Sequence, residues 1–125
     1  MVVIAVGQLA PASGPAAAIA GTVLLAAGFY ALTAHLAARY VLGSVPVRPA
    51  VGVGVVLAVV ALLLRPFGPA PVIATSLAID VAAIKGFYRV GWRATALVAV
   101  THYTVSAILG ITLFNLVRLL ATAPG

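Results

Sequence analysis

Four long apolar runs, separated by short links that carry most of the charges, constrain this chain more than any other feature. The runs extend from Ala16 to Ala34, from Ala50 to Leu64, from Ala70 to Ile84 and from Ala94 to about Leu120. A helix needs about 20 apolar residues to cross the hydrocarbon core of a bilayer, whereas a membrane strand needs only about 10. Because the links are short, the runs predict four transmembrane helices, each antiparallel to the next.

Proline and glycine mark where these helices begin and end. Ser13-Gly14-Pro15 is typical of a helix start, whereas the Gly- and Pro-containing links 43–49 and 65–69 break the runs. We therefore predict an all-α fold, a polytopic membrane protein built as a bundle of four transmembrane helices. The single transmembrane domain covers residues 1–125, with helices at about 15–39, 47–65, 70–88 and 93–118.

The amino-terminal segment is apolar but lacks the basic region that precedes the apolar part of a secretory signal. Its apolar run is also too short for such a signal. We expect residues 1–14 to form an outer tail of the mature protein.

Composition decides between a soluble and a membrane fold. Hydrophobic residues make up 65% of the 125 positions and charged residues only 6%, which is too little charge to cover a soluble core. The net charge of +6 comes from single basic residues between apolar runs. Such spacing favours anchoring at lipid headgroups and excludes a nucleic-acid partner, which would need dense basic patches.

Catalytic and metal-binding motifs are absent from the sequence. No cysteine is present, which excludes thiol catalysis and thiolate-bound metals. No spacing matches a phosphate-binding loop, a zinc-protease helix or a Ser-His-Asp nucleophile motif. We therefore expect no enzymatic activity, no cofactor and no metal site.

The basic residues predict the orientation. Five of them lie in or beside the first and third links, and two lie on the opposite side: Arg39, Arg48, Lys85, Arg89 and Arg93 against Arg65 and Arg118. Because cytoplasmic links are enriched in Lys and Arg, links 40–48 and 86–92 are predicted to be cytoplasmic. The aromatic residues Tyr40, Phe87, Tyr88 and Trp92 gather at the same boundary. Both termini would lie outside a multi-pass protein of the cell (plasma) membrane.

Asp80 is the only acidic residue of the chain and interrupts the third apolar run. A carboxylate at the centre of a membrane helix costs about 2.5–3.5 kcal/mol, so Asp80 needs a partner or a proton. Lys85 and Arg89 point about 140° and 180° away from it on the same helix. In a hairpin that turns near Gly91, Asp80 and His102 are each 11 residues from the turn, which predicts that they meet.

Two serines extend this predicted pair. Ser76 and Ser106 lie one helical turn from Asp80 and His102, at matching depth, and we expect a polar ladder across the third and fourth helices. These two helices would then form the centre of the bundle. We interpret the remaining polar residues of the helices as interhelical hydrogen-bonding groups: Tyr30, Thr33, Tyr103 and Asn115. His35 is expected at the solvated edge of the first helix, with a role beside Asp80 as the alternative.

Two functions from different classes are compatible with this intramembrane polar pair. In the first, Asp80 and His102 fix helix packing in a structural or accessory subunit of a membrane assembly. In the second, they form a protonatable site in a small proton- or ion-coupled transporter or channel that acts as an oligomer. The expected partners are the lipid bilayer and either further copies of the chain or a larger membrane complex. A water-accessible cavity at Asp80 would favour transport, and a dry, hydrogen-bonded Asp80 would favour structure.

Two segments carry a family resemblance. Lys85-Gly86-Phe87-Tyr88-Arg89-Val90-Gly91-Trp92-Arg93-Ala94-Thr95, and further along Phe114-Asn115-Leu116-Val117-Arg118, resemble uncharacterised small membrane proteins of halophilic archaea. The preference for Arg over Lys and the many Ala, Val and Gly residues suit a GC-rich genome. The resemblance implies a four-helix membrane fold and an archaeal source. It implies no activity and no functional residues.

Overall fold

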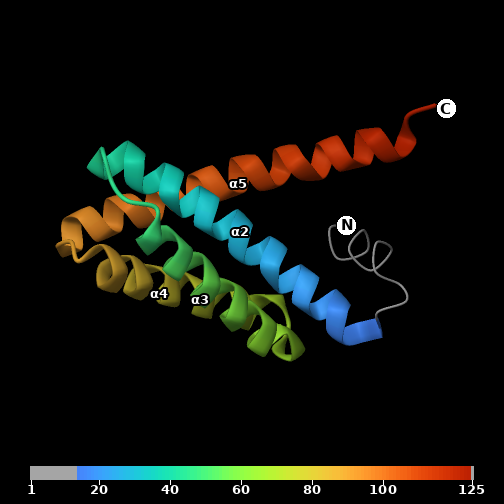
Figure 1. Cartoon of the computed structure of the whole chain (residues 1–125), viewed down its shortest axis with the longest axis horizontal. Helices are drawn as coiled ribbons and strands as arrows, with labels where there is room; N and C mark the ends of the chain where they lie inside the picture. Colours follow the sequence, from blue (N-terminus) through green and yellow to red (C-terminus); the bar gives the residue numbers. More distant parts are fainter. Residues whose placement is uncertain (1–13, 125) are drawn as a thin grey trace.

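The computed structural model describes residues 14–124, which are almost entirely helical. The elements in chain order are α2 (Gly14–Leu42), α3 (Arg48–Leu64), the short 3-10 turn η2 (Arg65–Phe67), α4 (Pro69–Tyr88) and α5 (Trp92–Thr122) (Figure 1). Four helices within this part of the chain are long and apolar enough to cross a membrane, which confirms the predicted all-α, four-helix fold class. The predicted outer tail and the exclusion of a signal concern residues 1–13, which lie outside the described residues.

Two helices extend beyond their predicted ends. The predicted ends lie at about residues 39 and 118, whereas α2 continues to Leu42 and α5 to Thr122, so that Arg39 and Arg118 lie inside the helices. An arginine does not end a helix, since its long side chain can carry the charge away from the apolar surface. The backbone ends α2 instead, at Gly43, which adopts a φ of 87° that glycine tolerates.

The turns that follow α3 and α4 differ in their strain. Gly68 has a φ of 92° and lies directly before the proline that opens α4, so both residues suit their positions. Arg89, which ends α4, is the one non-glycine with positive φ among the described residues, at 54°. Its amide donates to the Lys85 carbonyl oxygen at 3.0 Å. The α4–α5 turn therefore has a left-handed residue where glycine would fit without strain.

The first and second helices, α2 and α3, and not the predicted pair of the third and fourth, form the centre of the bundle. α2 lies between α3 and α5 and packs against both over long stretches, whereas α4 packs mainly on α3 and meets α5 over a short one (Figure 1). The prediction was wrong because a single polar pair can join two helices locally. Extended contact instead needs small residues that let backbones approach closely. The core is accordingly rich in alanine: Ala34, Ala37, Ala38, Ala50, Ala58, Ala83 and Ala99.

Gly54 is where α2 and α3 approach most tightly. A β-carbon added there would lie 2.7 Å from the Ala31 nitrogen and 2.9 Å from its β-carbon, and closer still to the Ala27 carbonyl oxygen. Since two of these three neighbours are backbone atoms, no side-chain rotation could make room. The α2–α3 contact therefore depends on the missing side chain of Gly54.

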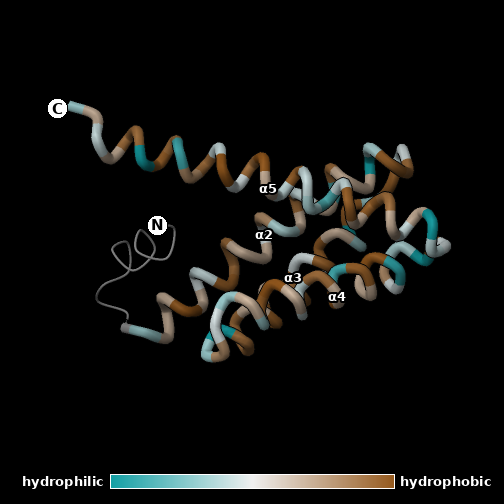
Figure 2. The backbone as a smooth tube through the Cα atoms, turned by 180° about the vertical axis from the view of Figure 1, so that it is seen from behind, coloured by the Kyte–Doolittle hydropathy of each residue, from teal (hydrophilic) through white to brown (hydrophobic). Residues whose placement is uncertain are grey.

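Large apolar side chains cover the outside of the bundle. Among those more than half exposed are Leu24, Leu63, Ile73, Val100 and Leu119. Figure 2 shows hydrophobic colour along all four helices. Most hydrophilic segments lie at the end that holds the α2–α3 link and the α4–α5 turn, and others lie on the far part of α5 and at the α3–α4 turn. We call the end with the α2–α3 link, which carries Arg39, Arg48, Lys85, Arg89 and Arg93, the basic end of the bundle.

Candidate functional site

Three polar side chains from three helices meet inside the bundle, and we call them the polar cluster. His102 of α5 stands between the other two: its Nδ1 lies 3.0 and 2.9 Å from the two carboxylate oxygens of Asp80 on α4. Its Nε2 lies 2.9 Å from the Thr33 hydroxyl on α2. The imidazole therefore links all three helices through hydrogen bonds.

The polar cluster is buried. Thr33 and Asp80 have 0% of their surface exposed and His102 has 2%. Ile84 and Val98, which are also fully buried, belong to the same packed core. Buried groups of this kind are stable only when each donor and acceptor finds a partner, and all three side chains do.

The Thr33 hydroxyl limits where the protons can lie. It has one hydrogen and two neighbouring acceptors, the Tyr30 carbonyl oxygen at 3.1 Å and His102 Nε2 at 2.9 Å. If Thr33 donates to Tyr30, then His102 Nε2 donates to Thr33 and the Asp80–His102 pair holds two protons. If Thr33 donates to His102, the pair holds one proton and leaves a net negative charge.

The two arrangements differ in the charge that they place inside the bundle. A buried net charge needs a nearby counter-charge, and its desolvation is expensive without one. Lys85, the cation nearest in sequence, turns away: its Nζ donates to the Val90 carbonyl oxygen at 3.1 Å and lies 4.7 Å above the Trp92 ring. The pair with two protons carries no net charge and satisfies every donor around His102.

Of the four predicted site residues, the structure brings Asp80 and His102 into contact, and the two serine side chains form no hydrogen bond with them. Ser76 contributes only its backbone carbonyl oxygen, which accepts from the Tyr103 hydroxyl at 3.2 Å. The Ser106 hydroxyl is buried without a protein partner. Tyr103 lies beside His102 on α5 and occupies the level where the serines were expected to meet, since its ring reaches from α5 to α4.

Thr33 was recognised in the sequence as an interhelical group but was not joined to Asp80. A signal for it exists: Thr33, Asp80 and His102 lie nine, eight and ten residues from the basic ends of their helices. Depth counted from this shared end therefore aligns all three. The hairpin symmetry used in the sequence analysis compares only consecutive helices, and α2 and α5 are not consecutive.

Three further buried polar atoms lack a protein partner within the described residues: His35 Nδ1, the Tyr88 hydroxyl and the Ser106 hydroxyl. His35 and Tyr88 lie between the polar cluster and the basic end, and Ser106 lies on its other side. His35, expected to be solvated at the edge of its helix, is only partly exposed.

The polar cluster places a hydroxyl, an imidazole and a carboxylate in the order of a nucleophilic triad. Thr33, however, is fully buried, and its hydroxyl contacts the Tyr30 carbonyl oxygen as well as the imidazole. A substrate carbonyl has no access to that oxygen. Among residues 14–124 no group of three or more His, Cys, Asp or Glu side chains is placed to hold a metal ion.

Residues 12–124 match a family of unknown function, DUF7473. Neither the curated proteins nor the solved structures contain a match to the chain.

Proposed function

Since the chain belongs to this family of unknown function, we propose a function from the geometry: a structural or accessory subunit of a membrane assembly, whose polar cluster holds three transmembrane helices together. The observation that carries the proposal is the burial of Thr33, Asp80 and His102 at 0, 0 and 2% exposure with mutual hydrogen bonds. A site that takes up protons or ions needs a route for water. A buried and fully bonded cluster is suited to fixing helix positions.

The surface supports the membrane location. Leu24, Leu63 and Ile73 are exposed by 73, 67 and 60%, which is costly in water and favourable in lipid. The basic end would lie in the cytoplasm and both termini outside, at the cell membrane. The proposed source remains the halophilic archaea that segment 85–95 indicates.

The free energy that the polar cluster contributes to the bundle can be bounded. Hydrogen bonds between membrane helices contribute on average about 0.6 kcal/mol each, with a maximum near 1.7. The two links of the cluster, from His102 to Thr33 and from His102 to Asp80, would therefore contribute about 1–3 kcal/mol together. This is a useful share of the stability of a small bundle.

The test combines flux with stability. The wild-type chain and Asp80→Asn are reconstituted in vesicles, and proton and cation flux are followed under an imposed gradient. The proposal expects both to match protein-free vesicles, while His102→Leu lowers the free energy of unfolding in detergent. Wild-type flux that Asp80→Asn abolishes would overturn the structural role in favour of transport.

The second candidate is a proton- or ion-coupled transporter or channel that acts as an oligomer. The observation that favours it is the set of unpartnered buried atoms on either side of the cluster: His35 Nδ1, the Tyr88 hydroxyl and the Ser106 hydroxyl. Such atoms invite water or an ion. Proton flux that is lost in Asp80→Asn and reduced in Tyr88→Phe would support this candidate.

A further inference from the structure

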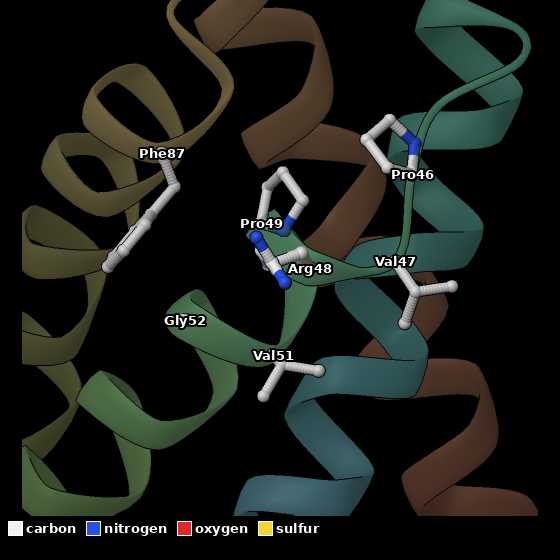
Figure 3. Close-up of a pocket in the computed structure, with 7 residues that line it drawn as sticks. All are labelled: Pro46, Val47, Arg48, Pro49, Val51, Gly52 and Phe87. Carbon is white, nitrogen blue, oxygen red and sulfur yellow. The ribbon is translucent and has the colours of Figure 1, made fainter.

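An apolar groove with a cation in its lining lies at the basic end of the bundle (Figure 3). Seven residues line it: Pro46, Val47, Arg48, Pro49, Val51, Gly52 and Phe87. Six belong to the start of α3 and the link before it, and the seventh, Phe87 of α4, lies with its ring against the backbone at Gly52. The groove is separate from the polar cluster, because no residue of the cluster lines it.

The wall of the groove depends on a glycine. A β-carbon at Gly52 would lie 2.6–2.9 Å from three atoms of the Phe87 ring, so the ring rests directly on the backbone of α3. Val47, Val51 and Phe87 nevertheless stay 56, 47 and 45% exposed. The groove thus presents apolar surface that neither helix covers.

Arg48 has no carboxylate partner in its own chain. The single acidic side chain, Asp80, is buried against His102. Four further cations stand at the same end of the bundle, and of these Lys85 is held by Val90 and Trp92. The dipole of α3, which begins at Arg48, adds positive potential at this point. An occupant that matches the groove combines a negative head with an apolar tail.

We propose that this groove binds one anionic phospholipid of the cytoplasmic leaflet. A lipid chain lies against Val51 and Phe87, and the phosphate pairs with the Arg48 guanidinium. Basic pockets beside membrane helices on the cytoplasmic side attract anionic headgroups in this way. The site rests on the membrane location and orientation proposed above and not on the role of Asp80.

Native mass spectrometry of the chain purified in mild detergent tests the site, with phosphatidylglycerol and phosphatidylcholine of identical chains as probes. The wild type is expected to retain phosphatidylglycerol preferentially. Arg48→Gln should weaken this retention about fivefold, because it removes the attraction of one cation to the anionic headgroup. Arg48→Lys should keep the preference, and Arg93→Gln, a cation at the same end outside the groove, should behave as the wild type.

A second variant tests the apolar half of the site. Val51→Trp is expected to fill the groove and lower phosphatidylglycerol retention while Arg48 stays in place. Equal retention of the two lipids by the wild type, or equal losses in Arg48→Gln and Arg93→Gln, would refute a specific site. If Val51→Trp retained phosphatidylglycerol as the wild type does, and inorganic phosphate displaced the lipid, the attraction would come from the headgroup alone. That result would also refute a specific lipid site.

A control separates the two proposals. A chain that stays in solution without detergent would contradict the proposed membrane location itself. A chain that needs detergent, keeps its helicity and a single size in every variant, yet shows no lipid preference would contradict the lipid site alone.

Discussion

Replacing Gly54 by alanine tests the α2–α3 contact on which the bundle is built. The added β-carbon would lie 2.7 Å from the Ala31 nitrogen and closer still to the Ala27 carbonyl oxygen, and ordinary contact begins at 3.4 Å, so the helices must separate by at least about 0.7 Å. Overpacking of this kind costs about 1–3 kcal/mol. Alanine also has a helix propensity about 1 kcal/mol better than glycine, which offsets part of this cost.

Gly28 provides the matched control. It lies on α2, is exposed, and has no atom within 4 Å of an added β-carbon, so Gly28→Ala gains the propensity without any clash. The difference between the two variants cancels the propensity and isolates the contact. We expect Gly54→Ala to unfold about 1–3 kcal/mol more easily than Gly28→Ala.

The assay is reversible unfolding in mixed micelles, followed by circular dichroism and by the fluorescence of Trp92. Both variants should first show wild-type helicity and size. Equal stabilisation of the two variants would mean that α2 and α3 do not approach closely at Gly54, and the helix arrangement would then be wrong.

Substitutions at three further positions have distinct expected outcomes in the same assay. Asp80→Asn should lower the free energy of unfolding by less than about 1 kcal/mol, because an amide can donate to His102 Nδ1. Asp80→Leu leaves that nitrogen unpaired and should lower it by about 1–3 kcal/mol. Equal effects of the two substitutions would argue against the hydrogen bond. Arg89→Gly should stabilise by about 1 kcal/mol, since it removes a side chain from left-handed backbone at a φ of 54°. A loss of stability there would contradict the strained turn. Tyr103→Phe should lower the free energy of unfolding by about 0.6 kcal/mol, the typical value for one interhelical hydrogen bond in membranes. A decrease well above about 1.7 kcal/mol would contradict a contribution from this single hydrogen bond.

Much of the fold could be predicted because apolar length and helix breakers act locally. A long apolar run has few alternatives to an apolar helix, and glycine or proline residues mark most of the breaks between the runs. The helix neighbours could not be predicted in the same way. Gly54 and the alanines of α2 permit a close approach, but small residues occur throughout this sequence and do not reveal which faces meet.

The candidate site was predictable in part for a similar reason. Asp80 is the only acid, so its need for a partner is visible, and hairpin symmetry then leads to His102. Thr33 belongs to a helix that is distant in the chain. Its depth matches that of the pair, but only the packing of α2 against α5 shows that it faces His102. The serine ladder was expected from depth alone, and depth does not include the volume of Tyr103, which reaches across to α4.

The most direct test of the central claim is a double-mutant cycle between Thr33→Val and His102→Leu. These substitutions remove the two ends of the 2.9 Å contact that ties α2 to α5 and thus to Asp80. Because the cycle cancels the other effects of each change, it measures the coupling of this pair. If the polar cluster clamps the helices, the coupling of the free energies of unfolding should be about 0.6–1.7 kcal/mol in favour of the native pair. Additive effects of the two substitutions would contradict the clamp.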